Sequence, residues 1–259
     1  MKIAIITGAS SGLGKEYVKE LGMKEAGIDE LWVIARRKER LMELSQLSRI
    51  PVRALPYDLV KKSSIDELSK LLAEERPDIR ILINAAGFGK IGSTVEIGLE
   101  DTDRMIELNC RAAVDMTYIC LPYMREGSRI MEICSTSGFQ PFQYLNVYAA
   151  SKAFLYRFSR ALRVELFSRK IKVTAVCPYW IKDTEFIPAA ESGGAKRDKK
   201  IRHYPLSSGV HSVAVHSLMD SSLGFAVSTP GIVCTAHRIA AKVIPAELMM
   251  GIWAILRRV

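Results

Sequence analysis

The 259-residue sequence has no run of 18 or more uninterrupted apolar residues, so we expect no segment to span a membrane. The opening stretch, MKIAIITG, has an apolar run shorter than a signal peptide needs. Cysteine is scarce: the five thiols are odd in number, far apart, and show no CxxC or Cys/His spacing. These absences argue against a disulfide framework and against a metal site. They favour a cytoplasmic protein with reduced thiols.

The basic residues do not form one stripe interleaved with aromatic residues, so we do not expect nucleic acid as a partner. The formal net charge is nevertheless +9, and the cations fall in separate clusters at 36–40, 196–203 and 257–258. Most of these are expected on solvated faces, although the first cluster has a more specific use below. Hydrophobic residues make up 49% of the chain, which is enough for a large core.

Short apolar runs alternate with helix-length segments along most of the chain. Because continuous apolar strands separated by helices indicate a parallel sheet covered on both faces, we predict a doubly wound α/β fold of the Rossmann type. The predicted strands are 2–7, 30–35, 52–57, 79–84, 129–135 and 172–177. Helical spacing is clearest over 61–75 and 99–124. We expect a single domain over 1–259, with ligands bound beyond the carboxyl ends of the strands.

This rhythm breaks after Pro178. Residues 180–209 are expected to form a substrate loop, because long insertions near strand ends are usually lids or binding loops. A helix near 210–221 and a short strand at 224–228 are predicted next. A helical segment is expected over about 235–257.

A glycine-rich turn, TGASSGLG, follows the first predicted strand. Its glycines allow a tight turn and close approach of the backbone to a pyrophosphate, which a helix N-terminus favours electrostatically. The spacing GxxxGxG differs from the common GxGxxG, and a purely structural turn is the alternative. The predicted cofactor-binding residues here are Gly8, Ser10, Ser11, Gly12, Leu13 and Gly14.

Two arginines stand at the end of the second predicted strand, where an NAD site carries a carboxylate for the ribose hydroxyl. The chain reads VIARRKER, with Arg36 and Arg37 at that place. A guanidinium suits a 2′-phosphate through charge-assisted forked hydrogen bonds. We therefore predict NADP(H) rather than NAD(H); the alternative is that these arginines only begin the next helix.

Two further segments fit the same pocket. Asp58, followed by Leu59, ends the third strand and could accept from an adenine amino group, or could cap a helix instead. The segment NAAG places small residues after the fourth strand, where a cofactor lies close to the backbone. Its predicted cofactor-binding residues are Asn84, Ala85, Ala86 and Gly87.

Tyr148 and Lys152 are four residues apart in a segment that reads as a helix start. Residues i and i+4 share one helix face, so the ammonium can lie beside the phenol. A nearby cation favours the phenolate and lowers the pKa of the tyrosine, which is otherwise about 10. Such a tyrosine could exchange a proton with an alcohol or a carbonyl. The alternative is an exposed helix face with a polar stripe.

Together, TGxxxGxG, the Asn-Ala-Gly motif and a serine followed by YxxxK resemble the short-chain dehydrogenase/reductase family over residues 1–184. Within the family, the chain resembles bacterial-type members and members like the hydroxysteroid dehydrogenases. The resemblance implies a nicotinamide cofactor and a homodimer or homotetramer. It implies Tyr148 as the acid/base, Lys152 as its helper, and Ser135 as the holder of the substrate oxygen. Asn109 would be a structural and proton-relay residue. Ser137 is the weaker alternative to Ser135.

The chain departs from the family pattern after the sixth strand, where Tyr179 and Trp180 replace the usual glycine and Thr184 comes one residue late. Pro178 and Ile181 are expected to keep their contacts with the cofactor. NAAG instead of NNAG is a smaller departure.

Aromatic residues crowd the segments expected near the substrate. Apolar walls with few polar groups bind bulky hydrophobic ligands, so we predict a lipophilic ketone or secondary alcohol such as a steroid or bile acid. The alternative is that half of these rings only pack the loop. The rings are Phe139, Phe142, Tyr144, Tyr179, Trp180 and Phe186.

The role of the C-terminal segment and two alternative functions stay open at this point. The apolar C-terminal segment could lie on a membrane surface, close over the substrate, or pack at a subunit interface; packing is the simplest of these. A reductase of 3-oxoacyl thioesters is a second enzyme hypothesis. A third hypothesis for the function is a nucleotide-sensing regulator without catalysis. The retained Ser135, Tyr148, Lys152 and Asn109 argue against it.

Overall fold

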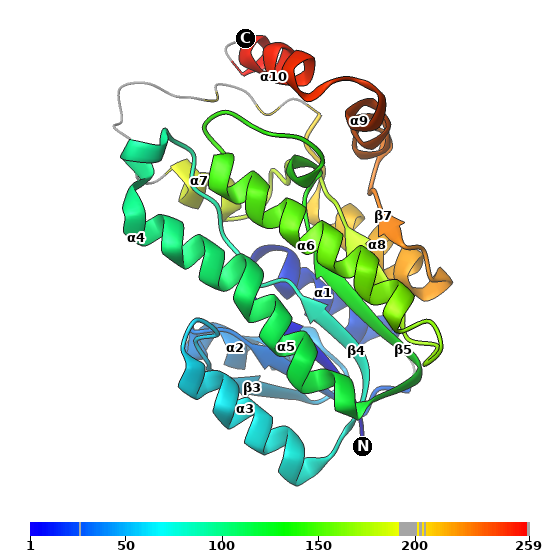
Figure 1. Ribbon diagram of the computed structural model, residues 1–259. Coiled ribbons are helices and arrows are strands. Elements are labelled where there is room, and N and C mark those ends of the chain that lie inside the picture. The colour runs from blue at the N-terminus through cyan, green and yellow to red at the C-terminus, as the bar shows by residue number, and fades with distance from the viewer. Residues whose placement is uncertain (26, 192–200, 202–203, 205, 258–259) are drawn as a thin grey trace.

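The computed structural model describes the chain except residues 26, 192–200, 202–203, 205 and 258–259. Much of the expected loop over 180–209, and all of the basic cluster at 196–203 except Ile201, therefore lie outside the described residues. Within the described part, the strands form one parallel sheet in the order β3-β2-β1-β4-β5-β6-β7 (Figure 1). The strands are β1 Lys2–Thr7, β2 Glu30–Ile34, β3 Val52–Leu55, β4 Asp78–Asn84, β5 Met124–Ile133, β6 Lys172–Val176 and β7 Val227–Ser228.

Helices cover both faces of this sheet, which confirms the predicted doubly wound Rossmann-type fold. Side chains alternate along a strand, so Ile3 and Ile5 of β1 face α3, α5 and α6, whereas Ala4 and Ile6 face α1 and α8. The helices are α1 Gly12–Lys24, α2 Lys38–Met42, α3 Lys62–Glu75, α4 Thr94–Ile106, α5 Ala112–Cys120, α6 Asn146–Glu165, α7 Phe186–Glu191, α8 Val210–Leu223, α9 Ile232–Val243 and α10 Ala246–Leu256.

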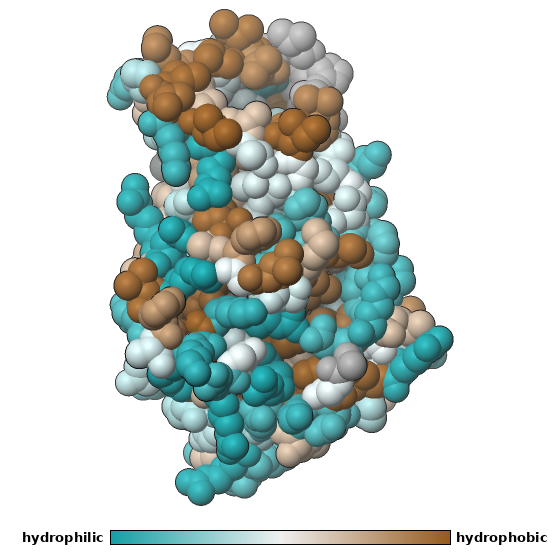
Figure 2. All heavy atoms as spheres, turned by 90° about the vertical axis from the view of Figure 1, so that its right-hand side faces the viewer, coloured by the Kyte–Doolittle hydropathy of each residue, from teal (hydrophilic) through white to brown (hydrophobic). Residues whose placement is uncertain are grey.

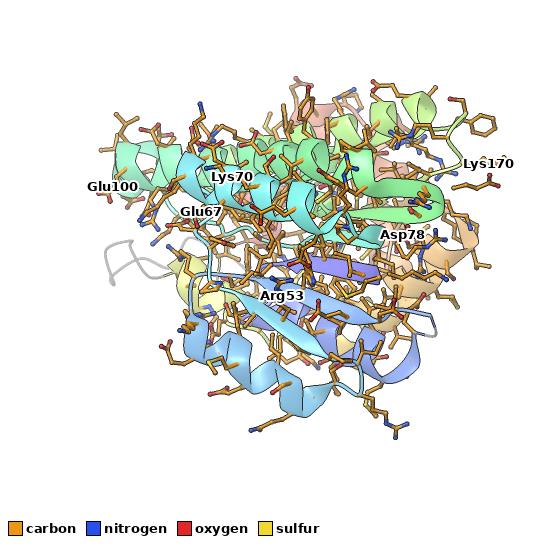
Figure 3. All side chains as sticks on the ribbon, turned by 90° about the horizontal axis from the view of Figure 1, so that it is seen from below. Arg53, Glu67, Lys70, Asp78, Glu100 and Lys170 are labelled. Atoms are coloured by element: carbon orange, nitrogen blue, oxygen red, sulfur yellow. The ribbon has the colours of Figure 1, made fainter. Side chains whose placement is uncertain are left out.

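At the β3 edge of the sheet, a charged side chain covers an aromatic ring. Arg53 of β3 lies over the ring of Trp32, 4.8 Å from its centre, and binds Glu75 of α3 at 2.7 Å. Glu67 and Lys70 of α3 are exposed on the outside of the molecule (Figure 3). An arginine therefore covers the indole face with its planar cation while its charge stays paired.

The helical region predicted over 99–124 is confirmed from Leu99 to Cys120; α4 has one further turn from Thr94, which the non-helical Gly98, with φ of +74°, separates from the rest. Ser93 and Glu96 form a capping box, in which the serine oxygen accepts from the Glu96 N–H and the carboxylate accepts from the Ser93 N–H. One wider turn, Glu107–Arg111, separates α4 from α5 and carries Asn109. The site residue thus sits where the helix changes its winding.

The C-terminal segment predicted as helical over about 235–257 is two helices, α9 and α10. Pro245 precedes α10 and has no N–H to continue α9, which is why the helix breaks there. Apolar side chains gather on this end of the molecule (Figure 2). The exposed ones on α9 and α10 are Ile232, Ile239, Val243, Leu248, Ile252, Ile255 and Leu256. Among the described residues, no helix combines the length and the apolar character that crossing a membrane requires.

Candidate active site

The glycine-rich turn forms one wall of the site between β1 and α1. Gly8 and Gly12 have φ of +66° and +51°, which L side chains rarely adopt. A Cβ on Gly8 would stand 2.8 Å from the Ala85 carbonyl oxygen. The Thr7 hydroxyl oxygen accepts from the Ala86 N–H at 3.0 Å and ties this turn to the end of β4. The glycine therefore lets the turn pack directly on the backbone after β4, at the start of a helix that favours an anion.

Arg37 joins the end of β2 to that turn. Its Nε and Nη2 donate to the Ser10 hydroxyl oxygen at 3.2 and 3.1 Å, and Nη2 also donates to Ser11 at 2.8 Å. Arg36 and Arg37 both line the cavity described below. The guanidinium and hydroxyl donors expected around a 2′-phosphate are thus brought together by the fold.

Asp58 does not cap a helix, because the N-cap residue of α3 is Lys61. Its carboxylate accepts from the Val60 N–H at 3.3 Å, which is a turn-capping contact. Asp58 and Leu59 also line the cavity. An adenine contact at Asp58 remains a prediction.

Ser135, Tyr148 and Lys152 meet where β5 ends against α6. The Ser135 hydroxyl lies close enough to the Tyr148 phenol to favour the phenolate and lower its pKa. The Ser135 oxygen also accepts from the Ser137 N–H at 3.1 Å. The Lys152 ammonium lies 5.8 Å from the centre of the Tyr148 ring and donates to the Ile133 carbonyl oxygen at 2.6 Å. The predicted proton-transfer group is therefore assembled, and Ser135 rather than Ser137 is the serine that reaches the phenol.

The electrostatics of this group differ from the sequence argument. Burial raises the pKa of Tyr148 above its ordinary value, and the hydrogen bond from Ser135 opposes that rise. Burial also lowers the pKa of Lys152, against the opposing effect of neighbours that include Cys134 and Glu132. The net pKa of Tyr148 is therefore raised rather than lowered as predicted, because desolvation of the phenolate is the largest effect.

Asn109 lies behind the cavity rather than in its wall. Its side-chain oxygen accepts from the Phe88 N–H at 3.0 Å, and its amide donates to the Phe88 carbonyl at 2.9 Å and to the Ser151 hydroxyl at 3.0 Å. Asn109 therefore fastens the segment after β4 to α6. This geometry accounts for a structural role; the relay role remains a prediction.

Asn84 is turned away from the cavity, contrary to its prediction as a cofactor contact. Its amide donates to the Thr117 hydroxyl at 3.0 Å and to Glu132 Oε1 at 2.9 Å, between the sheet and α5. Strand alternation explains the direction, because Asn84 shares the face of Leu82, which packs toward α5. The following residues Ala85, Ala86 and Gly87 line the cavity as predicted.

Glu132 is a site-adjacent residue that the sequence reading missed. It is fully buried in β5, and burial raises the pKa of its carboxyl to about 7. Hydrogen bonds from Asn84 and Thr117 and the charge of Lys152 oppose that rise. The sequence feature that could have revealed this residue is a lone carboxylate inside the apolar strand RIMEIC.

The cavity itself holds about 550 Å³ and runs from the arginines to the aromatic side. Phe139 and Tyr144 are not in its wall, contrary to the substrate prediction. The Phe139 ring packs edge-on against Tyr156, 5.4 Å between centres, and Tyr144 lies under the Arg257 guanidinium at 4.5 Å. The predicted residues that line it are Gly8, Ser10, Ser11, Gly12, Leu13, Gly14, Arg36, Arg37, Asp58, Leu59, Ala85, Ala86, Gly87, Ser135, Phe142, Tyr148, Lys152, Pro178, Tyr179, Trp180, Ile181 and Phe186.

The aromatic end of the cavity is built from three elements. Phe186 of α7 packs against Tyr148 of α6 with 5.3 Å between ring centres. Trp180 and Phe142 belong to the same apolar cluster, which Trp253 of α10 covers from outside. Lining residues that the sequence analysis did not name include Phe88, Gly89, Leu108, Leu145 and Ala189. Their positions depend on how the loops after β4 and β6 fold back.

One cluster of possible metal ligands lies outside this cavity. Glu16 and the buried Glu20 of α1 and the exposed His211 of α8 place their ligand atoms within 4.8 Å of one another. The His211 Nδ1 is 2.8 Å from a Glu16 oxygen. These contacts tie α8 to α1.

The comparisons with known proteins bear on this geometry. A family model described as short chain dehydrogenase matches residues 2–193. The chain belongs to the short-chain dehydrogenase family. It is 31% identical over 198 residues to an uncharacterised oxidoreductase of Staphylococcus epidermidis, which covers 76% of this chain and 84% of that relative.

Two solved structures share its architecture. A short-chain dehydrogenase from Sphingobium yanoikuyae in complex with NADPH has a TM-score of 0.79 and 28% identity, covering 96% of this chain and 95% of that one. The bulky-bulky ketone specific alcohol dehydrogenase from Comamonas testosteroni has a TM-score of 0.73 and 25% identity, with 95% of each chain covered. This short-chain dehydrogenase is thus an oxidoreductase whose fold binds a nicotinamide cofactor.

Proposed function

We propose that this short-chain dehydrogenase interconverts a bulky, hydrophobic ketone and its secondary alcohol with NADP(H), using Tyr148 as the acid/base. The observation that carries the proposal is that Ser135 and Tyr148 line one cavity, which continues to a cluster of aromatic rings. A carbonyl oxygen placed between these two hydroxyls would accept from both.

The chain supplies the proton and the orientation of the substrate. During reduction, Tyr148 donates its phenolic proton to the oxygen of the substrate, while Ser135 holds that oxygen. During oxidation, the same tyrosine takes the proton from the alcohol. Lys152, held by Ile133, favours the phenolate that donation leaves behind. The nicotinamide cofactor supplies or accepts the hydride.

The preference for NADP(H) rests on the arginines. Arg37, together with Ser10 and Ser11, presents a guanidinium and two hydroxyls at the end of β2. A 2′-phosphate gains charge-assisted hydrogen bonds there, whereas a ribose hydroxyl gains none of comparable strength. NADPH is the cofactor named for the relative from Sphingobium yanoikuyae.

The size and apolar walls of the cavity support the bulky substrate. Phe142, Trp180 and Phe186 supply aromatic surface opposite Tyr148. The relative from Comamonas testosteroni is named for bulky-bulky ketones. Within this class, a steroid or a bile acid is the specific candidate that we propose.

We also propose that the enzyme is a homodimer or homotetramer. Tyr118 of α5 and Phe154, Val164 and Phe167 at or just beyond α6 are exposed large apolar residues. Such a surface is typical of an interface between subunits. Sedimentation equilibrium measures the mass directly, and a monomer at micromolar concentration would contradict this proposal.

The function is tested by following the absorbance of NADPH and NADH with a panel of ketones. The panel holds steroid ketones, bile-acid ketones, small ketones and 3-oxoacyl thioesters. We expect turnover with NADPH and bulky ketones, and its loss in Tyr148→Phe. Tyr156→Phe is the matched control, because Tyr156 lies on the same helix outside the cavity. Preference for a thioester or for small charged substrates would overturn the substrate class, and full activity of Tyr148→Phe would overturn the mechanism.

A further inference from the structure

Glu185 reaches from the segment after β6 to the arginines that follow β2. Its Oε2 accepts from Arg37 Nη1 at 3.0 Å, and its Oε1 accepts from Arg40 Nη1 at 2.6 Å. Within the described part of the chain, Glu185 is the sole carboxylate paired with either arginine. One carboxylate therefore lies between two guanidinium groups at the place predicted for a phosphate.

The remaining hydrogen-bond donors of Arg37 bind the glycine-rich turn. Arg37 uses Nε and Nη2 on Ser10 and Ser11, which leaves its Nη1 side to Glu185. Arg40, one turn along α2, faces the second oxygen. A phosphate monoester that binds between these arginines uses the same edges that the carboxylate uses.

Glu185 is held near the arginines by its neighbours in sequence. Thr184 donates from its hydroxyl to the Ile181 carbonyl at 3.2 Å and accepts from the Phe186 N–H at 3.4 Å. The Phe186 ring packs on Tyr148. The backbone on both sides of Glu185 is therefore fixed, while its side chain, 54% exposed, can turn. The two arginines lower the pKa of the carboxyl, which keeps it charged at neutral pH.

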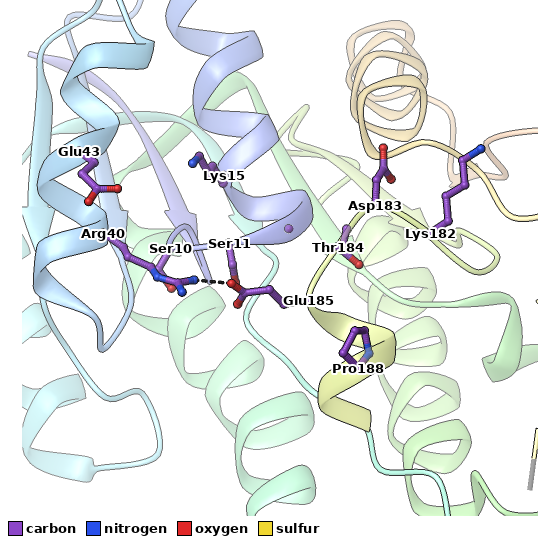
Figure 4. A pocket seen from close by; sticks show the side chains of 11 residues that line it. Ser10, Ser11, Lys15, Arg40, Glu43, Lys182, Asp183, Thr184, Glu185 and Pro188 are labelled. Carbon is purple, nitrogen blue, oxygen red and sulfur yellow. Dashed lines mark hydrogen bonds and ion pairs between the residues drawn. The ribbon is translucent and has the colours of Figure 1, made fainter. Parts of the chain in front are cut away.

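A hollow of about 640 Å³ lies beside this contact (Figure 4). Lys15 and Lys182 line it together with Glu43 and Glu185. A carboxylate that leaves the arginines can thus turn into an open space.

We propose that Glu185 is a specificity-determining residue that competes with the 2′-phosphate of the cofactor for Arg37 and Arg40. This inference rests on the proposed preference for NADP(H). A nucleotide with a 2′-phosphate must exchange with the carboxylate, whereas one with a 2′-hydroxyl leaves the ion pairs in place. Glu185 therefore makes the discrimination between the two cofactors smaller than the arginines alone would produce.

The test compares the binding of 2′,5′-ADP and 5′-ADP by titration calorimetry at fixed ionic strength. Neither compound carries a nicotinamide ring, so the readout does not depend on catalysis. Glu185→Gln keeps the shape of the side chain and removes its charge. We expect the preference for 2′,5′-ADP over 5′-ADP to rise about three- to tenfold in this variant, as for the loss of exposed ion pairs.

Glu43→Gln is the matched control. Glu43 is an exposed carboxylate of the same hollow and, in the described residues, has no ion pair. Its substitution removes the same charge, so it reports any general attraction of anions, and we expect no change in the preference. An equal gain in Glu43→Gln, or no gain in Glu185→Gln, would overturn the inference.

Arg37→Ala separates this inference from the function on which it rests. We expect the variant to lose the preference for 2′,5′-ADP, and we expect Glu185→Gln to add nothing in its background. A loss in Arg37→Ala without a gain in Glu185→Gln refutes the competition and leaves NADP(H) standing. If Arg37→Ala has no effect, both proposals are wrong.

Discussion

Lys152 donates from Nζ to the carbonyl oxygen of Ile133, the last residue of β5, at 2.6 Å. This bond fixes the ammonium behind the Tyr148 ring. The ammonium thus has a fixed position at the point where the tyrosine must become a phenolate. It lies 5.8 Å from the centre of the Tyr148 ring.

Lys152→Met is therefore expected to lower kcat by about 10² to 10⁴, the range typical of a lost acid/base contribution. Because the phenolate loses its cation, the remaining activity in the oxidative direction should increase toward alkaline pH. Steady-state rates between pH 6 and 10 measure both effects. The control is Lys170→Met, an exposed lysine paired with Glu126. A kcat for Lys152→Met within about fivefold of the wild type would contradict the role.

Gly8→Ala should remove nucleotide binding and destabilise the fold. A side chain at φ +66° is strained, and its Cβ would collide with the backbone of Ala85 and Ala86 at 2.8 Å. Gly27→Ala is the matched control, since Gly27 has φ +84° and nothing within 4 Å of its Cβ position. We expect Gly27→Ala to cost about 1 kcal/mol of unfolding free energy and to bind NADPH normally. Urea unfolding and calorimetry measure both; equal losses in the two variants would show that the collision is unimportant.

The strands and the proton-transfer group could be predicted because their signals are local. Continuous apolar runs fix the strands of a parallel sheet, and the spacing of four residues puts Tyr148 and Lys152 on one face of α6. The glycines of the turn could likewise be predicted, because glycine adopts a positive φ without the steric cost that other residues pay.

The residues that were misplaced depend on tertiary packing. Asn84 was assigned to the cofactor, but the strand register turns its amide toward Glu132 and Thr117. Tyr144, with φ of +65°, points to Arg257 instead of the cavity. The partner of Arg37 lies 148 residues away in sequence, at Glu185, so that no local pattern could predict it.

Trp253→Ala should affect bulky substrates selectively. The Trp253 ring is buried against Phe142, 4.9 Å between centres, and its N–H donates to the Gln143 carbonyl oxygen at 3.3 Å. Its loss frees α10 from the apolar cluster that contains Tyr148. We expect faster amide exchange over 246–256 and a higher KM for bulky ketones, with an unchanged KM for small ones. Trp253→Phe keeps the ring contact and should stay close to wild type. A change of equal size for small and bulky ketones would contradict the argument.

Glu132 predicts how stability depends on pH. Its carboxyl has a pKa of about 7 in the folded chain against an ordinary 4.5, so the folded state binds more protons than the unfolded state between these values. The free energy of unfolding therefore falls as pH rises from about 4.5 to 7 and then levels off. The shift corresponds to a loss on the order of 3 kcal/mol, because burial penalises the charged form.

Glu132→Gln removes this titration while keeping an oxygen for the Asn84 and Thr117 donors. We expect the variant to be more stable than the wild type at pH 8 and close to it at pH 5. Urea unfolding at both pH values gives the difference between the two proteins. Other titrating groups, such as His237, whose pKa is lowered by burial, contribute to both proteins and cancel in that difference. If the free energy of unfolding changes with pH equally in the wild type and the variant, Glu132 keeps its charge in the folded chain. In that case, its partners Asn84, Thr117 and Lys152 would outweigh its desolvation.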